Sequence, residues 1–201
     1  LSLFIGFYFG EDSSGSGGHG NLDEGYSGGD NPGTGYASFP QNGGGGGGAG
    51  GPGGNPAMNS RPTDNNYGAF GGEGVFSTIT GTPTGYAGGG SGGAHSPHAP
   101  SSGTAHNGDP RAGHQINIGK RFGGADGGSW QVAGGNATAN TGGGGGASGG
   151  AGQGCGGGGS GIVIFRMPTA YYTGTVTGSP TVTTDGSDTV VKFTGSGTYV
   201  S

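Results

Sequence analysis

The chain has 201 residues, of which 61 are glycine and 11 are proline, while only 27% are hydrophobic and 8% are charged. So little apolar surface excludes a conventional hydrophobic core along the whole length. The formal net charge of −5 provides no basic footprint for nucleic acid or anionic lipid, and a single cysteine, Cys155, excludes an intrachain disulfide framework. Cys155 is interpreted as a small residue within a glycine run, and an interchain bridge is the alternative.

Residues 1–9 form an apolar, aromatic stretch that ends at Gly10. It is about half as long as the ~20 residues that a membrane span requires, and it lacks the basic flank of a signal peptide. We therefore predict no membrane insertion and expect a β-strand that is buried or covered by a partner. Leu3, Ile5 and Phe7 are its candidate assembly residues.

Glycine runs fill most of the chain between this strand and residue 160. They cover Gly43–Gly48 continuing to Gly54, Gly88–Gly93, Gly142–Gly146, and Gly149–Gly159 with interruptions. Glycine at this density disfavours α-helix, and no G-X-Y period persists, which rejects collagen. We predict extended, polyglycine-II-type helices that hydrogen-bond sideways through their main chains, because no Cβ atom keeps them apart. Residues 1–160 are thus expected to form a glycine-rich bundle with essentially no α-helix.

Two inserts, residues 55–70 and 94–131, interrupt the glycine and carry most of the distinctive side chains. Aromatic residues and arginine dominate binding hot spots. The candidate receptor-binding residues are therefore Tyr67, Phe70, His95, His98, Arg111, His114 and Trp130. The alternative is that these side chains only pack against the ends of the bundle.

The last forty or so residues, 161–201, read as a small antiparallel β unit. Strands are predicted at residues 161–166, 174–184 and 189–200, and Asp185-Gly186 is a turn signal between the last two. Val191, Phe193 and Tyr199 are candidate assembly residues of the final strand. A motif also recurs: Thr78-Ile-Thr-Gly-Thr-Pro-Thr84 is echoed by Thr175-Val-Thr-Gly-Ser-Pro-Thr181, each combining β-branched residues with a Gly-X-Pro turn.

Catalytic and metal chemistry find little support in the pattern. His95 and His98 stand three residues apart with His106, Asp109 and His114 nearby, but no CxxC or HExxH scaffold is present. The run Gly156–Gly161 precedes a strand, whereas a phosphate loop follows a strand and opens a helix. No nucleophile elbow or defined carboxylate pair is found. We predict a protein that is not an enzyme and that uses no cofactor and no metal.

Four ordered motifs make the chain similar to a known family. They are Phe76-Ser-Thr-Ile-Thr-Gly-Thr82, Gly85-Tyr-Ala-Gly-Gly-Gly90, Asn136-Ala-Thr-Ala-Asn-Thr-Gly142 and Gly158-Gly-Ser-Gly-Ile-Val-Ile-Phe-Arg166, and Thr194-Gly-Ser-Gly-Thr-Tyr-Val200 follows them. Over roughly residues 20–200 the chain resembles the glycine-rich domain of tail-fibre and adhesin proteins in tailed bacteriophages. The resemblance implies a polyglycine-II bundle whose variable loops bind the host surface. The two inserts and the ending Phe165-Arg-Met167 depart from the family pattern.

Three functions remain open. The first is a non-enzymatic, extracellular virion module that binds a host cell-surface glycan or protein through its inserts, beside other virion proteins or copies of itself. The second is a self-assembling filament subunit joined by β-strand addition between residues 1–9 and 189–200. The third is an ice-binding protein, although the irregular inserts disfavour the flat repeat that ice binding requires.

Overall fold

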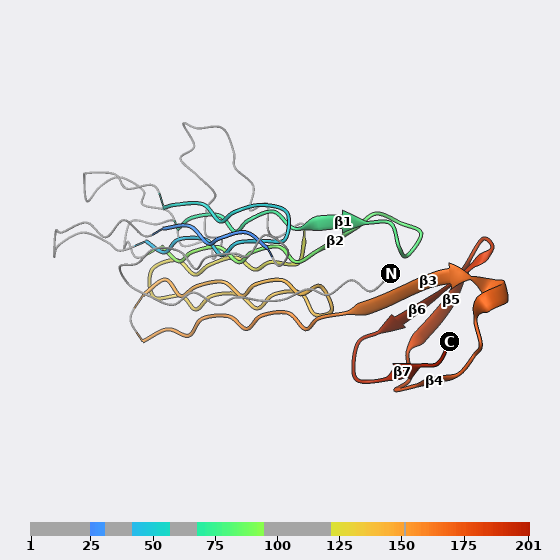
Figure 1. Cartoon of the computed structure of the whole chain (residues 1–201). Coiled ribbons are helices and arrows are strands. Elements are labelled where there is room, and N and C mark those ends of the chain that lie inside the picture. Colours follow the sequence, from blue (N-terminus) through green and yellow to red (C-terminus); the bar gives the residue numbers. More distant parts are fainter. Residues whose placement is uncertain (1–24, 31–41, 57–67, 95–121, 151) are drawn as a thin grey trace.

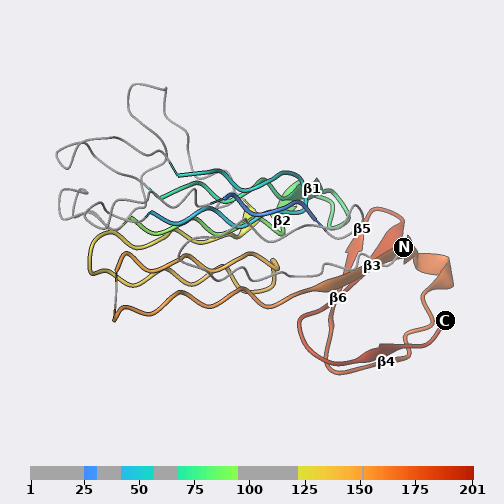
Figure 2. The ribbon, with the colours of Figure 1, turned by 60° about the vertical axis from the view of Figure 1, so that its left-hand side comes forward.

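The computed structural model describes residues 25–30, 42–56, 68–94, 122–150 and 152–201. In Figure 1, extended glycine-rich segments lie side by side, and the β-strands of the C-terminal part stand at one end of them. The turned view in Figure 2 shows the same arrangement. No α-helix occurs among these residues, and the strands are short and antiparallel. The predicted class, mostly β and irregular, is confirmed to this extent.

Main-chain hydrogen bonds join the glycine segments sideways with a spacing of three residues. Gly43, Gly46 and Ala49 donate their N–H groups to the carbonyl oxygens of Gly93, Gly90 and Ala87, each at 2.9 Å, so these two segments run antiparallel. On another side of the second segment, the N–H groups of residues 88, 91 and 94 bond the carbonyls of residues 122, 125 and 128 at 2.9–3.0 Å, and these segments run parallel. In a β ladder the same neighbour would be reached by every second residue.

Glycine is required where these segments touch. A Cβ atom built at Gly92 would lie less than 3.0 Å from the carbonyl oxygen of Gly43, and one built at Gly145 would clash equally with Gly156. The interior of this part is therefore main chain packed on main chain. Buried side chains within it are small and few, namely Ala69, Ala87, Ser91, Ala94, Ala125 and Ser129 together with Asn42 and the ring of Phe122.

A short hairpin extends from the glycine segments. Strand β1 (Val75–Ser77) pairs antiparallel with β2 (Thr84–Tyr86), with Ser77 opposite Thr84. The first copy of the repeated motif forms the loop of this hairpin. The second copy serves a different connection, because its strand β4 (Val176–Thr177) and the following β5 (Thr181–Asp185) belong to different sheets.

The C-terminal part is built of two small antiparallel sheets. Strands β3 (Val163–Pro168), β6 (Asp188–Phe193) and β5 form one sheet in the order β3-β6-β5, and β4 pairs with β7 (Thr198–Tyr199) in the other. One turn of 3-10 helix, η3 (Thr169–Tyr171), follows β3. Both of the long strands expected from the alternation are divided: positive φ angles at Gly178 and Ser179 separate β4 from β5, and residues 194–197 separate β6 from β7.

The predicted Asp-Gly turn is confirmed. Asp185 lies opposite Asp188, which leaves Gly186 and Ser187 as a two-residue hairpin loop between β5 and β6. Gly186 has φ of 61°, a conformation that glycine adopts without strain at the first central position of a type II′ turn.

A small apolar cluster holds the two parts together. Tyr86 and Ala87, at the junction of β2 with a glycine segment, pack with Ile164 of β3 and Val190 of β6. Val75, Ile79, Ile162 and Ala49 are partly buried against the cluster. Because it contains residues of both parts, the cluster fixes the β1–β2 hairpin against the three-stranded sheet.

Candidate functional site

The loop of the β1–β2 hairpin meets the three-stranded sheet through one arginine. Arg166 on β3 donates from Nε to Asp188 at 2.8 Å and from Nη1 to Asp185 at 2.7 Å. Nη1 also lies 3.4 Å from the carbonyl oxygen of Ile79 in the hairpin loop. The hydrogen bonds to Asp185 and Asp188 raise the pKa of the Arg166 guanidinium, so its charge is held firmly.

The fit around this arginine is close. A Cβ atom at Gly81 of the hairpin loop would lie 2.6 Å from Oδ2 of Asp185, and Gly81 has φ of +88°. Glycine is therefore the residue that allows the loop to approach the carboxylate. The arginine bridge sets the position of the hairpin loop relative to β3, β5 and β6.

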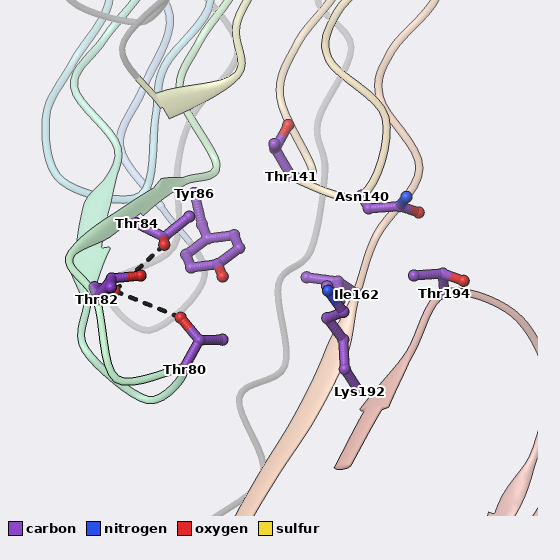
Figure 3. Close-up of a pocket in the computed structure, with 9 residues that line it drawn as sticks. All are labelled: Thr80, Thr82, Thr84, Tyr86, Asn140, Thr141, Ile162, Lys192 and Thr194. Atoms are coloured by element: carbon purple, nitrogen blue, oxygen red, sulfur yellow. Dashed lines mark hydrogen bonds between the residues drawn. The ribbon is translucent and has the colours of Figure 1, made fainter. Parts of the chain in front are cut away.

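Beside this bridge an open groove of about 390 Å³ lies between the hairpin and the sheet (Figure 3). Its walls come from three distant parts of the sequence: the hairpin, the turn near residue 140, and the strands of the C-terminal sheet. The lining residues are Thr80, Thr82, Thr84, Tyr86, Asn140, Thr141, Ile162, Lys192 and Thr194.

The groove is rich in hydroxyl groups. The Oγ1 atoms of Thr80 and Thr84 donate to the carbonyl of Thr82 at 3.4 and 3.3 Å, and Oγ1 of Thr141 donates to the carbonyl of Thr138 at 2.7 Å. A hydroxyl that donates one hydrogen bond still has lone pairs with which to accept others. The threonines can thus accept hydrogen bonds from a ligand without losing those they make.

Among the groups of the groove without a polar partner in the described part of the chain, two stand out, the Tyr86 hydroxyl and the Lys192 ammonium. Tyr86 is only 4% exposed, and its hydroxyl forms no hydrogen bond there. Lys192 forms no ion pair there either and is the only charged residue of the lining. In Figure 3 the Tyr86 hydroxyl points into the space between the hairpin and the strand that carries Lys192. The lining contains no carboxylate, thiol or imidazole.

Most of the predicted receptor-binding residues lie outside the described residues, namely Tyr67, His95, His98, Arg111 and His114. Phe70 and Trp130 are described, and both are half-buried. The ring of Phe70 covers Gly54, whose N–H donates to the carbonyl of Phe70 at 2.9 Å. Trp130 lies in a turn closed by a hydrogen bond from Val132 to Ser129 at 2.8 Å. Phe70 thus packs on a glycine segment.

The predicted assembly residues fall in two places. Leu3, Ile5 and Phe7 lie outside the described residues. Val191 and Phe193 are buried in β6, which pairs with β3 on one side and β5 on the other, so β6 offers no free edge. Tyr199 stacks on Tyr172 with ring centroids 6.1 Å apart, and its hydroxyl lies 3.1 Å from Sδ of Met167. These three side chains stabilise the C-terminal sheets.

Sequence reasoning did not find the groove. The available signal is the threonine-rich motif at 78–84, which by itself indicates only β-branched residues combined with a Gly-X-Pro turn. Lys192 and Thr194 were visible as residues of a strand. Nothing in the sequence indicates that these stretches meet, because the hairpin and the sheet are joined through a few apolar residues and one arginine.

The described residues contain no group of three or more histidine, cysteine, aspartate or glutamate side chains arranged to hold a metal ion. Cys155 is a free, exposed thiol in the outer glycine segment. Within the described ranges, no helix has the length and apolar character needed to cross a bilayer. Comparison with known proteins gave no match, whether to a family model, to a curated protein or to a solved structure.

Proposed function

We propose that the chain is a non-enzymatic structural and adhesive module of a bacteriophage fibre, in which a polyglycine-II-type bundle displays inserts that bind a host surface. The proposal includes an extracellular, virion location and a host glycan or protein as partner. The motifs of the phage glycine-rich domain support it from the sequence side.

The observation that carries the proposal is the three-residue spacing of the lateral hydrogen bonds. A polyproline-II-type helix has three residues per turn and no internal hydrogen bonds, so its N–H and C=O groups point outward. Every third residue then faces the same neighbour, as residues 43, 46 and 49 face 93, 90 and 87. Glycine in such helices lets neighbouring backbones come into contact, which accounts for the clashes that a Cβ atom at Gly92 would cause.

The positions of the residues beside the inserts support display. In Figure 1 the described segments 25–30, 42–56 and 68–94 run along the bundle to the end that lies away from the β-strands. Hydrogen bonds connect this end: the N–H of Asp30 bonds Oδ1 of Asn55 at 2.7 Å, and Gly43 bonds both Gly93 and Ala69 at 2.9 and 3.0 Å. Segments that are hydrogen-bonded to one another at this end provide a firm base for the presentation of loops.

The test is to remove most of the second insert while keeping the glycine segments intact. Replacing residues 96–120 by a Gly-Ser linker should abolish attachment of the labelled protein to its host among a panel of bacteria, with thermal unfolding unchanged. The linker, with residues 95 and 121, joins Ala94 to Phe122. Because Phe122 is hydrogen-bonded to Gly88, the linker must span the length of the segment from residue 94 back to residue 88. Six residues at about 3.1 Å each make this roughly 19 Å, so about 12 linker residues suffice. Unchanged attachment by the folded variant would refute the adhesive function.

A filament subunit is the second candidate, and the outer edge of β5 favours it. Residues 181–184 are exposed, and β5 pairs only with β6 among the described residues. Exposed edges are sites of strand addition. If residues 1–9 of another copy add to this sheet, their deletion should remove polymers in sedimentation velocity and leave the monomer folded. An intact chain that stays monomeric at high concentration contradicts this candidate.

A further inference from the structure

We propose that the groove between the β1–β2 hairpin and the C-terminal sheet binds an anionic saccharide. Its sugar hydroxyls would face Tyr86 and the threonines, and its carboxylate or phosphate group would face Lys192. The inference goes beyond the display of inserts, because it places a binding site at the opposite end of the glycine bundle, and it holds whether or not the inserts are adhesive.

The buried phenol is the first reason. Tyr86 is 4% exposed and belongs to the apolar cluster with Ile164 and Val190, yet its hydroxyl has no hydrogen-bond partner in the described part of the chain. Buried tyrosine hydroxyls normally find a partner. Since the hydroxyl points into the groove (Figure 3), a ligand oxygen can take the place of water as its hydrogen-bond partner.

The second reason is the chemistry of the walls. Threonines 80, 82 and 84 present hydroxyl and carbonyl groups from the hairpin, and Asn140 and Thr141 add an amide and another hydroxyl from the adjacent turn. Hydroxyl and carbonyl oxygens that accept hydrogen bonds, together with an amide that can donate them, match the hydroxyl pattern of a sugar ring. The threonine methyl groups and Ile162 supply apolar surface for its C–H faces.

The third reason is charge. Lys192 faces the groove from β6, opposite Ile164, with no carboxylate in the lining. The protein carries a formal net charge of −5, yet this ammonium group has no acidic partner among the described residues. A single lysine suits one carboxylate or phosphate group. A nucleic acid strand would need several cations along its backbone and aromatic rings for stacking, which the lining lacks.

Hydrogen bonds and ion pairs also hold the walls of the groove in place in the absence of a ligand. Arg166 fixes the hairpin loop through Asp185, Asp188 and the carbonyl of Ile79. On the other wall, the backbone N–H of Asn140 bonds Oγ of Ser160 at 2.9 Å, and that hydroxyl donates to Oδ1 of Asn140 at 3.0 Å. Walls held in this way lose little freedom on binding, which favours affinity.

The experiment titrates the full chain with trigalacturonate, with 3′-sialyllactose and with neutral maltotriose, by calorimetry and by two-dimensional amide NMR. We expect at least one acidic saccharide to bind about tenfold or more tightly than maltotriose, with shifts at residues 80–86, 140–141 and 192–194. Lys192→Gln should remove this preference, a loss of about tenfold or more. Tyr86→Phe, which deletes only the hydroxyl, should weaken binding about five- to tenfold.

Thr183→Val, an exposed substitution on β5 outside the groove, is the matched control and should bind as the wild type does. Binding of the acidic saccharide should weaken as salt is raised, because one ion pair is formed. No binding of either acidic saccharide at millimolar concentration, binding insensitive to both substitutions, or shifts outside the groove would overturn the proposal. Equal affinity for inorganic phosphate would also overturn it, since it would show a simple anion site.

Discussion

Alanine at Gly92 tests the main-chain core directly. The new Cβ atom would lie on the carbonyl oxygen of Gly43, which is backbone and cannot rotate away. The two segments must separate, and this disturbs three hydrogen bonds: Gly43 to Gly93 at 2.9 Å, Ala69 to Gly43 at 3.0 Å and Gly92 to Ala69 at 2.8 Å. The perturbation is thus confined to lateral contacts between glycine segments.

The expected loss of stability follows from those bonds. A buried donor or acceptor left without a partner costs about 1–3 kcal/mol, so the loss of three bonds lowers the free energy of unfolding by roughly 3–9 kcal/mol. That is a large part of the 5–15 kcal/mol typical of a folded domain. Chemical denaturation of Gly92→Ala, with circular dichroism as the signal, measures the difference.

Gly46→Ala, in the neighbouring glycine run, is the matched control. Its Cβ atom would lie 3.6 Å from the nearest atoms of Gly90, an ordinary contact, and its φ is not positive. Alanine there restricts the unfolded chain and should leave stability unchanged or raise it by up to about 1 kcal/mol. If both substitutions change the free energy of unfolding by equally small amounts, the backbones of the two segments are not in contact, and the reasoning is refuted.

Three further predictions concern the junction and the C-terminal part. Phe122→Ala removes a ring that is 1% exposed and lies 4.7 Å from Phe76, so thermal or chemical unfolding should show a loss of about 3–5 kcal/mol, while the same change at the exposed Phe76 should cost much less. Arg166→Gln should speed hydrogen exchange of the hairpin, and its effect should shrink in high salt; unchanged exchange would mean that the arginine does not hold the loop. Gly186→Ala places a Cβ in open space at φ of 61° and should cost about 1–2 kcal/mol in denaturation, with Ser187→Ala nearly neutral; equal effects would contradict the turn assignment.

The C-terminal sheet could be predicted from the sequence, because apolar and polar residues alternate in this part and Asp185-Gly186 is a strong turn signal. The lateral bonding of glycine runs could be predicted as well, since glycine has no side chain to bury. Which run lies beside which could not, because successive glycines carry no pattern that distinguishes one neighbour or register from another. The β1–β2 hairpin was missed because three-residue strands are too short for alternation to show.

The groove could not be predicted from the sequence, for a different reason. Its threonines, Tyr86 and Lys192 belong to stretches that only the folded junction brings together. Each stretch alone is typical of an ordinary strand or turn. The decisive signals, a buried hydroxyl and an ammonium group that have no partner among the described residues, exist only in three dimensions.

The three-residue spacing of the lateral bonds also limits how the chain can change in length. Loss or gain of one or two residues inside a run such as 88–94 would turn every following amide toward the wrong neighbour. A change of three residues would turn each amide back toward its own neighbour and, in the proposed polyglycine-II-type helix, alter the length of the segment by about 9 Å. Natural variation in the length of these runs should therefore occur in multiples of three, while the connections at their ends are free to vary in any number.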